Sequence, residues 1–559
     1  MNSETTSPAQ TVPCDLAGTA RGEARTSLLN RLFLVIAMLF VVVRALPILS
    51  FPIGRDQGTY LTIGQGLLDG KQLYRDLWDN KPPGIFFLYA GIAKVFGRVM
   101  WSVAVVDILL LLVISYLLFR FSEPYLGRGG AALAVMVHAS WHGEIRYYWI
   151  AQPETFQLVC VLSAILLLRW HRRWWKARCL AAGLLLGYAC WLKYNGVAFL
   201  PLLLFLPFLD TSGLDRELPR VSLTIPWRSW LAKAALVLTG LAGALGVVLT
   251  WIVLKGAWPA MREMQFEVLP RYAAMGLQRN PHYLLSAFVR TNYWLGVRNL
   301  WATLVGLLVA RLRRDLRRFA PLLLGALTAY AAVVMQLRFH DYYFQTCYPF
   351  FASIWAYLVV STYECARALA RNFRQRGWRL AAGLVWIVFA EAVFWPLPEE
   401  FNKLTMRYEE LREWRADPEG FYSNYPRQLP VELLRGQFDV IHYLEKNAKR
   451  SDNIYLWGSN CLIYYLTGRQ APTRFVSNLG IVSLWVQPSW REELMRDLRN
   501  TQPPFIIVTR GDALPTITYV NLDSEKYLRT FPEFDSFITN NYKAAADFGS
   551  FVIYEREGK

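Results

Sequence analysis

The segment from residue 54 to residue 84 concentrates side chains that could do chemistry. It reads GRDQGTYLTIGQGLLDGKQLYRDLWDNKPPG. Asp56 is a candidate base, because a carboxylate near cations stays ionised and accepts a proton from a hydroxyl. Arg55 and Lys81 are cations suited to a phosphate, and the two prolines after Lys81 restrict the backbone around it. This set favours transfer of a group from a phosphate-linked donor to an alcohol, although Asp56 could instead be a turn-forming residue before Gly58.

Later segments add further ionisable candidates. Glu144 and Glu154 bracket the stretch GEIRYYWIAQPET, Lys193 lies in WLKYNG, and His340 precedes DYYF. We interpret Lys193 as a third phosphate-binding cation and the others as candidate substrate contacts. Each has a structural alternative. Glu154 could cap a helix, and Lys193 could snorkel from a helix end. His340 could be a hydrogen-bonded interface histidine, and Glu144 a purely structural residue.

Aromatic side chains accompany these clusters. Tyr60 follows Asp56, and Tyr342 and Tyr343 follow His340. Aromatic rings here could stack on a sugar, so these three tyrosines are candidate substrate contacts. At a membrane surface such rings equally form the ordinary aromatic belt.

The elements that must position these residues are hydrophobic. Of 559 residues, 54% are hydrophobic, and they gather in runs of about 15 to 24, roughly what a helix needs to cross a bilayer. The chain is therefore predicted to be a polytopic membrane protein with about eleven spans. The predicted spans are 31–50, 101–119, 130–145, 154–168, 179–193, 196–209, 231–254, 287–310, 319–337, 343–362 and 378–396.

Basic residues predict the orientation, because Lys/Arg-rich short loops stay cytoplasmic. The formal net charge is +18, and the basic clusters all fall in loops on one side of the predicted bundle, at helix ends, which argues against nucleic-acid binding. The N-terminal tail, residues 1–30, is then cytoplasmic, while residues 51–100 and everything after Pro396 lie outside. The apolar segment 85–96 must lie at the interface or against the bundle, since a crossing there would reverse every later loop. The seven cysteines show no CxxC spacing and are interpreted as core residues.

Residues 397–559 are predicted to form a second, extracytoplasmic α/β domain after the transmembrane domain of residues 31–396. IHYLEKNAKR and CLIYYLTG look helical, whereas DNIYLWG, PFIIVTR and FGSFVIYERE look like strands. No glycine-rich phosphate loop or metal-ligand cluster is evident there. Packing or acceptor handling is the favoured role for this domain.

Taken in order, several motifs resemble the GT-C superfamily of integral-membrane glycosyltransferases, and within it family 39 enzymes related to protein O-mannosyltransferases and to the lipid A aminoarabinose transferase. The resemblance covers about residues 30–360. It implies interfacial helices in the first outer loop and inverting transfer of a sugar from a polyprenyl-phosphate donor. It also implies Asp56 as the base, Lys81 and Lys193 at the donor phosphate, and Glu154 in the second carboxylate region. The motifs are RDQGTYLTIGQGLLDGKQLY, DNKPPG, the Phe96–Gly97 pair, QPET, LKYNG and DYYF with the proline at 349.

The chain departs from this pattern at two positions. Gln57 stands where many relatives carry a second acid, and Asn80 rather than an acid precedes Lys81. Both departures weaken the case for a divalent metal, and metal dependence stays open. The resemblance does not identify the acceptor either, because relatives glycosylate lipids, glycans and proteins alike.

We therefore expect a glycosyltransferase of the bacterial cytoplasmic membrane whose partners are a polyprenyl-phosphate sugar donor, an envelope acceptor and membrane lipids. Two other classes stay open. A lipid-linked-sugar translocator would place charges near the membrane midplane within inverted repeats. A non-catalytic envelope assembly protein would use the C-terminal domain as a binding module and leave the Asp56 segment unexplained.

Overall fold

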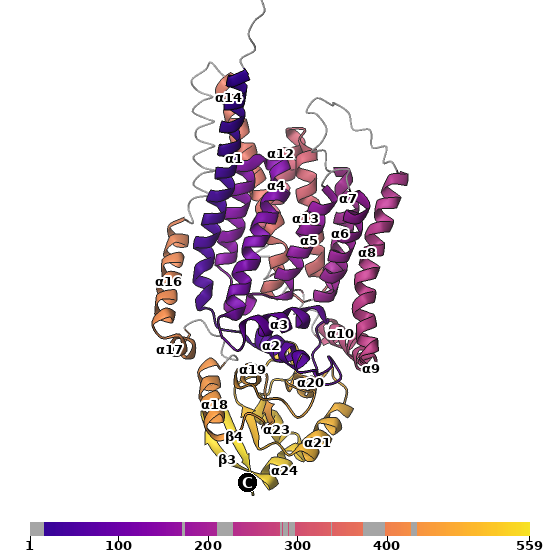
Figure 1. Cartoon of the computed structure of the whole chain (residues 1–559), viewed down its shortest axis with the longest axis vertical. Helices are drawn as coiled ribbons and strands as arrows, with labels where there is room; N and C mark the ends of the chain where they lie inside the picture. Colours follow the sequence, from indigo (N-terminus) through magenta and orange to yellow (C-terminus); the bar gives the residue numbers. More distant parts are fainter. Residues whose placement is uncertain are drawn as a thin grey trace, which may run out of the picture.

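The computed structural model describes residues 16–169, 174–209, 227–279, 297–336, 338–372, 397–425 and 433–558, with residues 282, 285 and 289. A bundle of helices makes up most of the length of the molecule, and an α/β domain lies at one end of it (Figure 1). The predicted fold class, an α-helical membrane domain with a C-terminal α/β domain, is confirmed.

Most predicted spans correspond to helices of this bundle. The span at 196–209 is divided between a short 3₁₀ segment and α7, the span at 287–310 is described at residue 289 and from residue 297 on, and the span at 378–396 lies outside the described residues. The bundle helices are α1 (Leu16–Ala45), α4 (Ser102–Gly143), α5 (Pro153–Arg169), α6 (Trp175–Leu192), η3 (Tyr194–Phe199), α7 (Leu200–Leu209), α8 (Trp227–Leu254), α12 (Val297–Leu312), α13 (Leu316–Val334) and α14 (Tyr348–Asn372).

The element α4 is a hairpin of two antiparallel helices and accounts for two predicted spans. Gly127 has φ 68° and ψ 176°, which breaks the helix three residues after Pro124. The His142 Nε2 and Asp107 Oδ2 atoms are 2.8 Å apart, whereas a straight helix would separate these residues by about 50 Å. The chain therefore doubles back at Gly127, as the spans predicted at 101–119 and 130–145 require.

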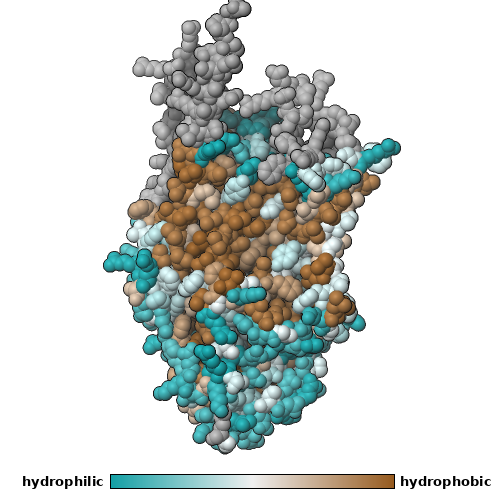
Figure 2. All heavy atoms as spheres, in the orientation of Figure 1, coloured by the Kyte–Doolittle hydropathy of each residue, from teal (hydrophilic) through white to brown (hydrophobic). Residues whose placement is uncertain are grey.

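The bundle presents an apolar surface suited to lipid. Exposed leucines and valines occur along α1, α4, α8 and α12, and Figure 2 shows a hydrophobic band between the hydrophilic C-terminal domain and the far end of the molecule. Among the described helices, four pass a length and composition criterion for a span, fewer than the predicted eleven, because others such as α5 and α12 are only 17 and 16 residues long. The four are Arg31–Ser50, Ser102–Gly143, Trp227–Leu254 and Leu316–Val334.

Between the bundle and the C-terminal domain lie α2 (Arg55–Leu68) and α3 (Gly84–Phe96), both from the first loop (Figure 1). Helix α3 contains the apolar segment 85–96, which was predicted not to cross the membrane. It packs against α2 and α6. Further short helices flank this layer. They are η1 (Leu46–Ser50), η2 (Tyr147–Trp149), α9 (Trp258–Arg262), the π-helix η4 (Glu263–Val268), α10 (Leu269–Arg279), η6 (Asp341–Thr346), α16 (Leu397–Ala416) and α17 (Pro418–Ser423).

The C-terminal domain contains one four-stranded sheet in the order β1-β2-β4-β3. Strands β1 (Ile454–Trp457) and β2 (Phe505–Thr509) are parallel, and β4 (Phe551–Arg556) runs antiparallel to β2 and to β3 (Tyr542–Asp547). Strand β3 was not predicted, since this edge strand reads YKAAAD and is mostly exposed. The helices of the C-terminal domain are α18 (Leu434–Asn447), α19 (Leu462–Thr467), α20 (Leu479–Val482), α21 (Ser489–Thr501), α22 (Pro515–Thr518), α23 (Ser524–Arg529) and α24 (Pro532–Asn541).

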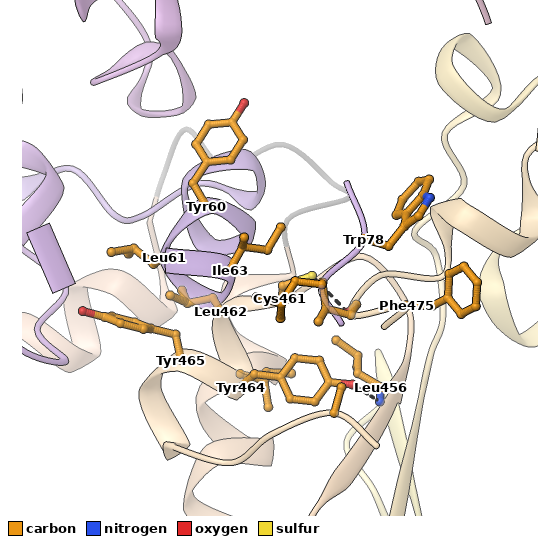
Figure 3. Close-up of a cluster of buried hydrophobic side chains, with 14 of the residues drawn as sticks. Tyr60, Leu61, Ile63, Trp78, Leu456, Cys461, Leu462, Tyr464, Tyr465 and Phe475 are labelled. Atoms are coloured by element: carbon orange, nitrogen blue, oxygen red, sulfur yellow. Dashed lines mark hydrogen bonds between the residues drawn. The ribbon is translucent and has the colours of Figure 1, made fainter. Parts of the chain in front are cut away.

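A tight contact joins α2 to the C-terminal domain. The Thr62 hydroxyl donates to the Cys461 carbonyl oxygen at 2.8 Å, and the Trp78 N–H donates to the Arg474 carbonyl oxygen at 2.8 Å. Leu61 and Leu462 lie on facing helices, within the buried cluster shown in Figure 3. A Cβ atom on Gly58 would lie 3.0 Å from the Leu462 Cβ, so the close approach of α2 and α19 depends on this glycine.

We predict that Gly58→Leu lowers the melting temperature of the purified protein, because overpacking a close contact typically costs about 1–3 kcal/mol. Gly91→Leu is the matched control, since Gly91 also lies in a first-loop helix but a Cβ there meets nothing within 4 Å. Thermal unfolding in detergent would compare the two. Equal melting temperatures for the two variants would contradict the proposed tight contact.

Candidate active site

A cavity of about 290 Å³ lies where the bundle, the first loop and the C-terminal domain meet. It brings together seven residues that the sequence singled out, from segments almost 300 residues apart. These are Arg55, Asp56, Tyr60, Lys81, His340, Tyr342 and Tyr343.

Asp56 owes its position to the start of α2. It lies in the first turn of this helix, where the helix dipole favours a negative charge. The Gln57 side chain, fully buried, donates to the Ile150 carbonyl oxygen at 2.9 Å and so fixes the start of the helix. Arg55 lies beside Asp56, with 3.5 Å between Arg55 Nη2 and Asp56 Oδ1. The carboxylate is thus held rigidly and presented to the cavity.

Opposite charges keep Asp56 ionised. Burial disfavours its charged form, but the positive charges of Lys81 and Arg55 outweigh burial, and the pKa of Asp56 lies below its ordinary value. Burial also disfavours the charged ammonium of Lys81, yet Asp56 and Asp79 raise the Lys81 pKa. At neutral pH the cavity therefore holds an ionised carboxylate and a protonated lysine.

The backbone fixes Lys81 and leaves its ammonium available. Its N–H donates to Asp79 Oδ1 at 2.8 Å, and its carbonyl oxygen accepts from the Tyr74 hydroxyl at 2.7 Å. Within the described part of the chain, the Lys81 ammonium has no hydrogen bond or ion pair. A cation held this way suits an anionic ligand such as a phosphate.

Asp79 is a carboxylate of the cavity that sequence reasoning missed. Burial raises its pKa to about 6, and the negative charge of Asp56 adds to the effect although Lys81 opposes it. Asp56 and Asp79 therefore differ in protonation between about pH 4 and pH 6. The only sequence signal was the position of Asp79 two residues before Lys81.

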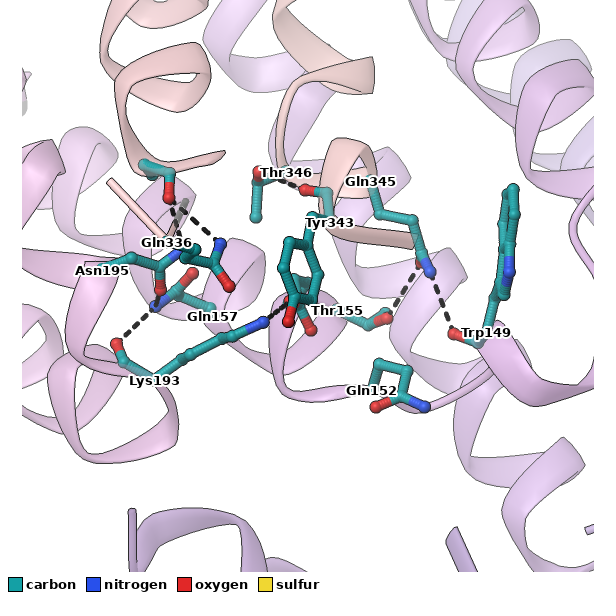
Figure 4. A network of polar contacts seen from close by, with 12 residues as sticks. Trp149, Gln152, Thr155, Gln157, Lys193, Asn195, Gln336, Tyr343, Gln345 and Thr346 are labelled. Atoms are coloured by element: carbon teal, nitrogen blue, oxygen red, sulfur yellow. Dashed lines mark hydrogen bonds and ion pairs between the residues drawn. The ribbon is translucent and has the colours of Figure 1, made fainter. Parts of the chain in front are cut away.

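Lys193 and Glu154 pair with each other behind the cavity wall. Glu154 is fully buried, and Lys193 forms an ion pair with it. The Lys193 ammonium also lies 3.4 Å from the centre of the Tyr343 ring, which lines the cavity. Figure 4 shows Lys193 extending to Tyr343. Lys193, which was predicted to bind the donor phosphate, thus pairs with Glu154 and supports Tyr343 in this structure, and its contact with a phosphate stays a prediction.

A buried polar network holds the segment that contributes Trp149 to the cavity. The Asp107 carboxylate, fully buried, accepts from the Ala151 N–H at 2.7 Å and lies 2.8 Å from His142 Nε2. The Gln345 side chain donates to the Trp149 carbonyl oxygen at 3.0 Å (Figure 4). His142 is therefore a positioning residue of this network.

Glu144 does not line the cavity. It pairs with Arg44 at 3.2 Å and lies 3.6 Å from Lys403, in a cluster that also includes Glu400. Glu144 was predicted to contact substrate, whereas in the structure it links the end of α4 to α16. The structural alternative for Glu144 is the one this geometry favours.

His340 lines the cavity as a neutral group. Burial, helped by the charge of Arg338, lowers its pKa to about 3. Its ring stacks on Tyr342 with 5.9 Å between the ring centres. Tyr60 lies below, its hydroxyl 3.5 Å from Gln152 Oε1. These rings form an aromatic side of the cavity next to the charged one.

Arg338 and Tyr272 also escaped sequence reasoning. The Arg338 guanidinium lies 3.8 Å from the centre of the Tyr272 ring and donates to the Tyr519 hydroxyl at 2.7 Å and to the Thr516 carbonyl oxygen at 3.1 Å. It thereby ties the bundle to the C-terminal domain at the cavity rim. Tyr272 lies 66 residues from Arg338, and Thr516 and Tyr519 lie 178 and 181 residues away, so no local pattern could reveal these contacts. Within the described residues, no group of three or more His, Cys, Asp or Glu side chains is placed to hold a metal ion.

The architecture resembles that of a solved membrane protein, and two segments of the chain match family models. Residues 80–254 match the model of the dolichyl-phosphate-mannose-protein mannosyltransferase family. Residues 436–557 match the model described as the putative competence-induced protein Ccs4 C-terminal domain. No curated protein sequence matches the chain.

Solved structures resemble the whole chain. ArnT from Cupriavidus metallidurans in the apo state is 13% identical, with a TM-score of 0.52, over 95% of this chain and 98% of that chain. The same ArnT bound to undecaprenyl phosphate aligns with 13% identity and a TM-score of 0.49, over 94% of this chain and 97% of that chain. The oligosaccharyltransferase AglB from Archaeoglobus fulgidus, in complex with an inhibitory peptide and a dolichol-phosphate, is 13% identical, with a TM-score of 0.45, over 95% of this chain and 75% of that chain.

We predict that Asp79 makes the folded protein less stable as the pH rises from about 4 to about 6. Its pKa of about 6 in the folded protein exceeds its ordinary value of 3.8, so the folded state binds more protons in this window and stability falls with rising pH. Asp79→Asn should remove that fall, which melting temperatures measured against pH would reveal.

Asp76→Asn is the control, because it should change the dependence of stability on pH in the opposite direction. Its hydrogen bond to Arg75 lowers the Asp76 pKa, so the ionised side chain stabilises the fold above the unfolded pKa and this contribution is lost as pH falls. If the two variants shifted the pH profile in the same direction, the environment assigned to Asp79 would be wrong.

Proposed function

We propose that this chain transfers a sugar from a polyprenyl-phosphate-linked donor to a hydroxyl of an envelope lipid, glycan or protein. The observation that carries the proposal is the cavity in which an ionised Asp56 faces a protonated Lys81 whose ammonium has no partner among the described residues. The match of residues 80–254 to a family described by a dolichyl-phosphate sugar donor supports the lipid-phosphate class.

In this proposal Lys81 and Arg55 hold the donor phosphate. Breaking the bond to the sugar leaves extra negative charge on the phosphate, and fixed cations stabilise that charge. The prenyl chain would lie along the apolar surface of the bundle, the hydrophobic band that Figure 2 shows next to the hydrophilic C-terminal domain.

Asp56 acts as the general base in the transfer step. It accepts the proton of the acceptor hydroxyl while the hydroxyl oxygen forms a bond to the anomeric carbon. The bond from that carbon to the phosphate oxygen breaks, its electron pair stays with the phosphate, and the anomeric configuration inverts. A bound phosphate would also compete for the charge of Lys81, which lowers the Asp56 pKa in the empty cavity. Donor binding would therefore make Asp56 a stronger base.

The proposed orientation places the cavity outside the cytoplasm. Arg318 donates to the Tyr125 carbonyl oxygen and pairs with Glu364, so it lies at the α4 turn, the end of the bundle away from Asp107 and the cavity. Arg120 and Arg128 lie at the same turn. Because basic short loops stay cytoplasmic, the C-terminal domain would face the outer side of a bacterial inner membrane.

We predict that Asp56→Asn lowers turnover by about 10²–10⁴-fold, the usual contribution of a general base, with the fold retained. A polyprenyl-phosphate sugar should then accumulate in cells, as it does when the chain is absent, and mass spectrometry of lipid extracts would detect it. Asp69→Asn, on an exposed residue of the same loop, is the control. Turnover near the wild-type rate in Asp56→Asn would exclude Asp56 as the base.

Lys81→Gln should weaken binding of undecaprenyl phosphate at least about tenfold, because a charge-assisted contact is lost. Binding to the protein in lipid nanodiscs would provide the measurement. The matched variant is Lys71→Gln: Lys71 belongs to the same loop but points to the Ala471 carbonyl oxygen, outside this cavity. Equal affinities of the two variants for undecaprenyl phosphate would mean that the phosphate does not bind at Lys81.

A further inference from the structure

The two sides of the cavity differ in charge. The side formed by the first loop and the segment at 338–343 carries every ionisable group named above as lining it. The side formed by the C-terminal domain carries hydroxyls and aliphatic groups and, among the described residues, no charged side chain. Its residues are Ser459, Ser477, Leu479, Leu514, Thr516 and Ile517.

Ser459 reaches the cavity from the carboxyl end of a parallel strand. It follows β1, which pairs in parallel with β2, and residues 514–517 follow β2. In open α/β sheets, ligands bind outside the carboxyl ends of such strands. A Cβ atom on Gly458 would lie 2.0 Å from the Thr509 hydroxyl, so this glycine lets the two strand ends approach and fixes Ser459 at the cavity.

The buried polar atoms of the cavity lining that lack a hydrogen-bond partner among the described residues include the hydroxyl of Ser459, a residue only 1% exposed, and the indole N–H of Trp78, a residue 4% exposed. The Trp78 ring is held between Trp485 and Trp490, with ring centres 6.3 and 5.8 Å away. Buried polar atoms are nearly always hydrogen-bonded in native proteins. These two fixed groups, one from each side of the domain boundary, are therefore suited to hydrogen-bond a ligand.

We propose that the C-terminal domain binds the acceptor through a neutral sugar ring, hydrogen-bonded by Ser459 and Trp78. A wall of hydroxyls and aliphatic side chains matches the two kinds of surface a sugar offers, its hydroxyls and its apolar C–H groups. A charged group on this wall would lose its hydration without gaining a counter-ion there. The inference rests on the proposed transferase function and adds the chemical class of its acceptor.

The ring assigned to this wall is the acceptor's rather than the donor's. The donor is anchored in the lipid, and its phosphate is assigned to Lys81 on the opposite side. The C-terminal domain has a hydrophilic surface and projects away from the apolar band (Figure 2). An acceptor arriving from the aqueous side would lie against the wall that contains Ser459 and present its hydroxyl towards Asp56.

Binding of methyl glycosides to the full-length protein tests this assignment. Saturation-transfer NMR would be recorded in nanodiscs with undecaprenyl phosphate present, using millimolar methyl glucoside, galactoside and mannoside. At least one neutral glycoside should bind, and methyl glucuronide, its anionic counterpart, should bind more weakly. Ser459→Ala and Trp78→Phe should each weaken binding about fivefold, the scale of one neutral hydrogen bond.

Ser483→Ala is the matched control, because Ser483 is also a buried serine of the C-terminal domain with an unpaired hydroxyl among the described residues, but it does not line the cavity. Its glycoside affinity should equal that of the wild type. The subsite is refuted if no neutral glycoside binds, if Ser459→Ala equals Ser483→Ala, or if methyl glucuronide binds as well. A second series records the spectra without undecaprenyl phosphate. Glycoside binding that is seen in its absence and lost when it is added would assign the ring to the donor and overturn the acceptor assignment. The effect of Lys81→Gln on undecaprenyl phosphate binding tests the transferase proposal separately, so failure of the acceptor subsite can be told apart from failure of the proposed function.

Discussion

A single buried carboxylate holds the frame on which the cavity depends. Asp107 lies in the first arm of the α4 hairpin, is fully buried, and contacts His142 in the second arm and the Ala151 N–H beyond it. These contacts fix the two arms relative to each other and place the turn that begins α5. The same turn carries Trp149 to the cavity, and the neighbouring Ile150 carbonyl oxygen receives Gln57 at the start of α2. The position of Asp56 thus follows from a contact made inside the bundle.

The charges of the cavity are arranged in two layers. Asp56, Asp79 and Lys81 face the open volume, where burial first and then their charges on one another shift their pKa values. Glu154 and Lys193 lie behind Tyr343 and neutralise each other. The inner pair supports an aromatic wall without adding net charge, so most of the field that a ligand meets comes from the charged side chains that line the cavity.

The sequence predicted the fold class and the helices well, because apolar runs and basic loops are local patterns that a membrane imposes. The first-loop residues Arg55, Asp56 and Lys81 were also predictable, since they combine unusual residue types in one short segment. The roles of Glu144 and Lys193 were not, because each depends on a partner outside its own segment: Arg44 for Glu144, and Glu154 for Lys193. Charged residues at the edge of a bundle look alike in sequence whether they face a ligand or each other.

The C-terminal wall was the least predictable part for the same physical reason. Ser459 is an ordinary serine in its own segment and becomes a cavity residue only because α2 packs on α19. That contact joins Thr62 to Cys461, residues 399 positions apart. During synthesis, the segment bearing Asp56 and Lys81 is therefore complete long before the wall that closes its cavity. A ribosome-bound chain that stops before the C-terminal domain would hold these groups in an open, water-filled half-site, and the enclosure would arise only after that domain has folded. Competence of the site would in this way depend on synthesis of the C-terminal domain.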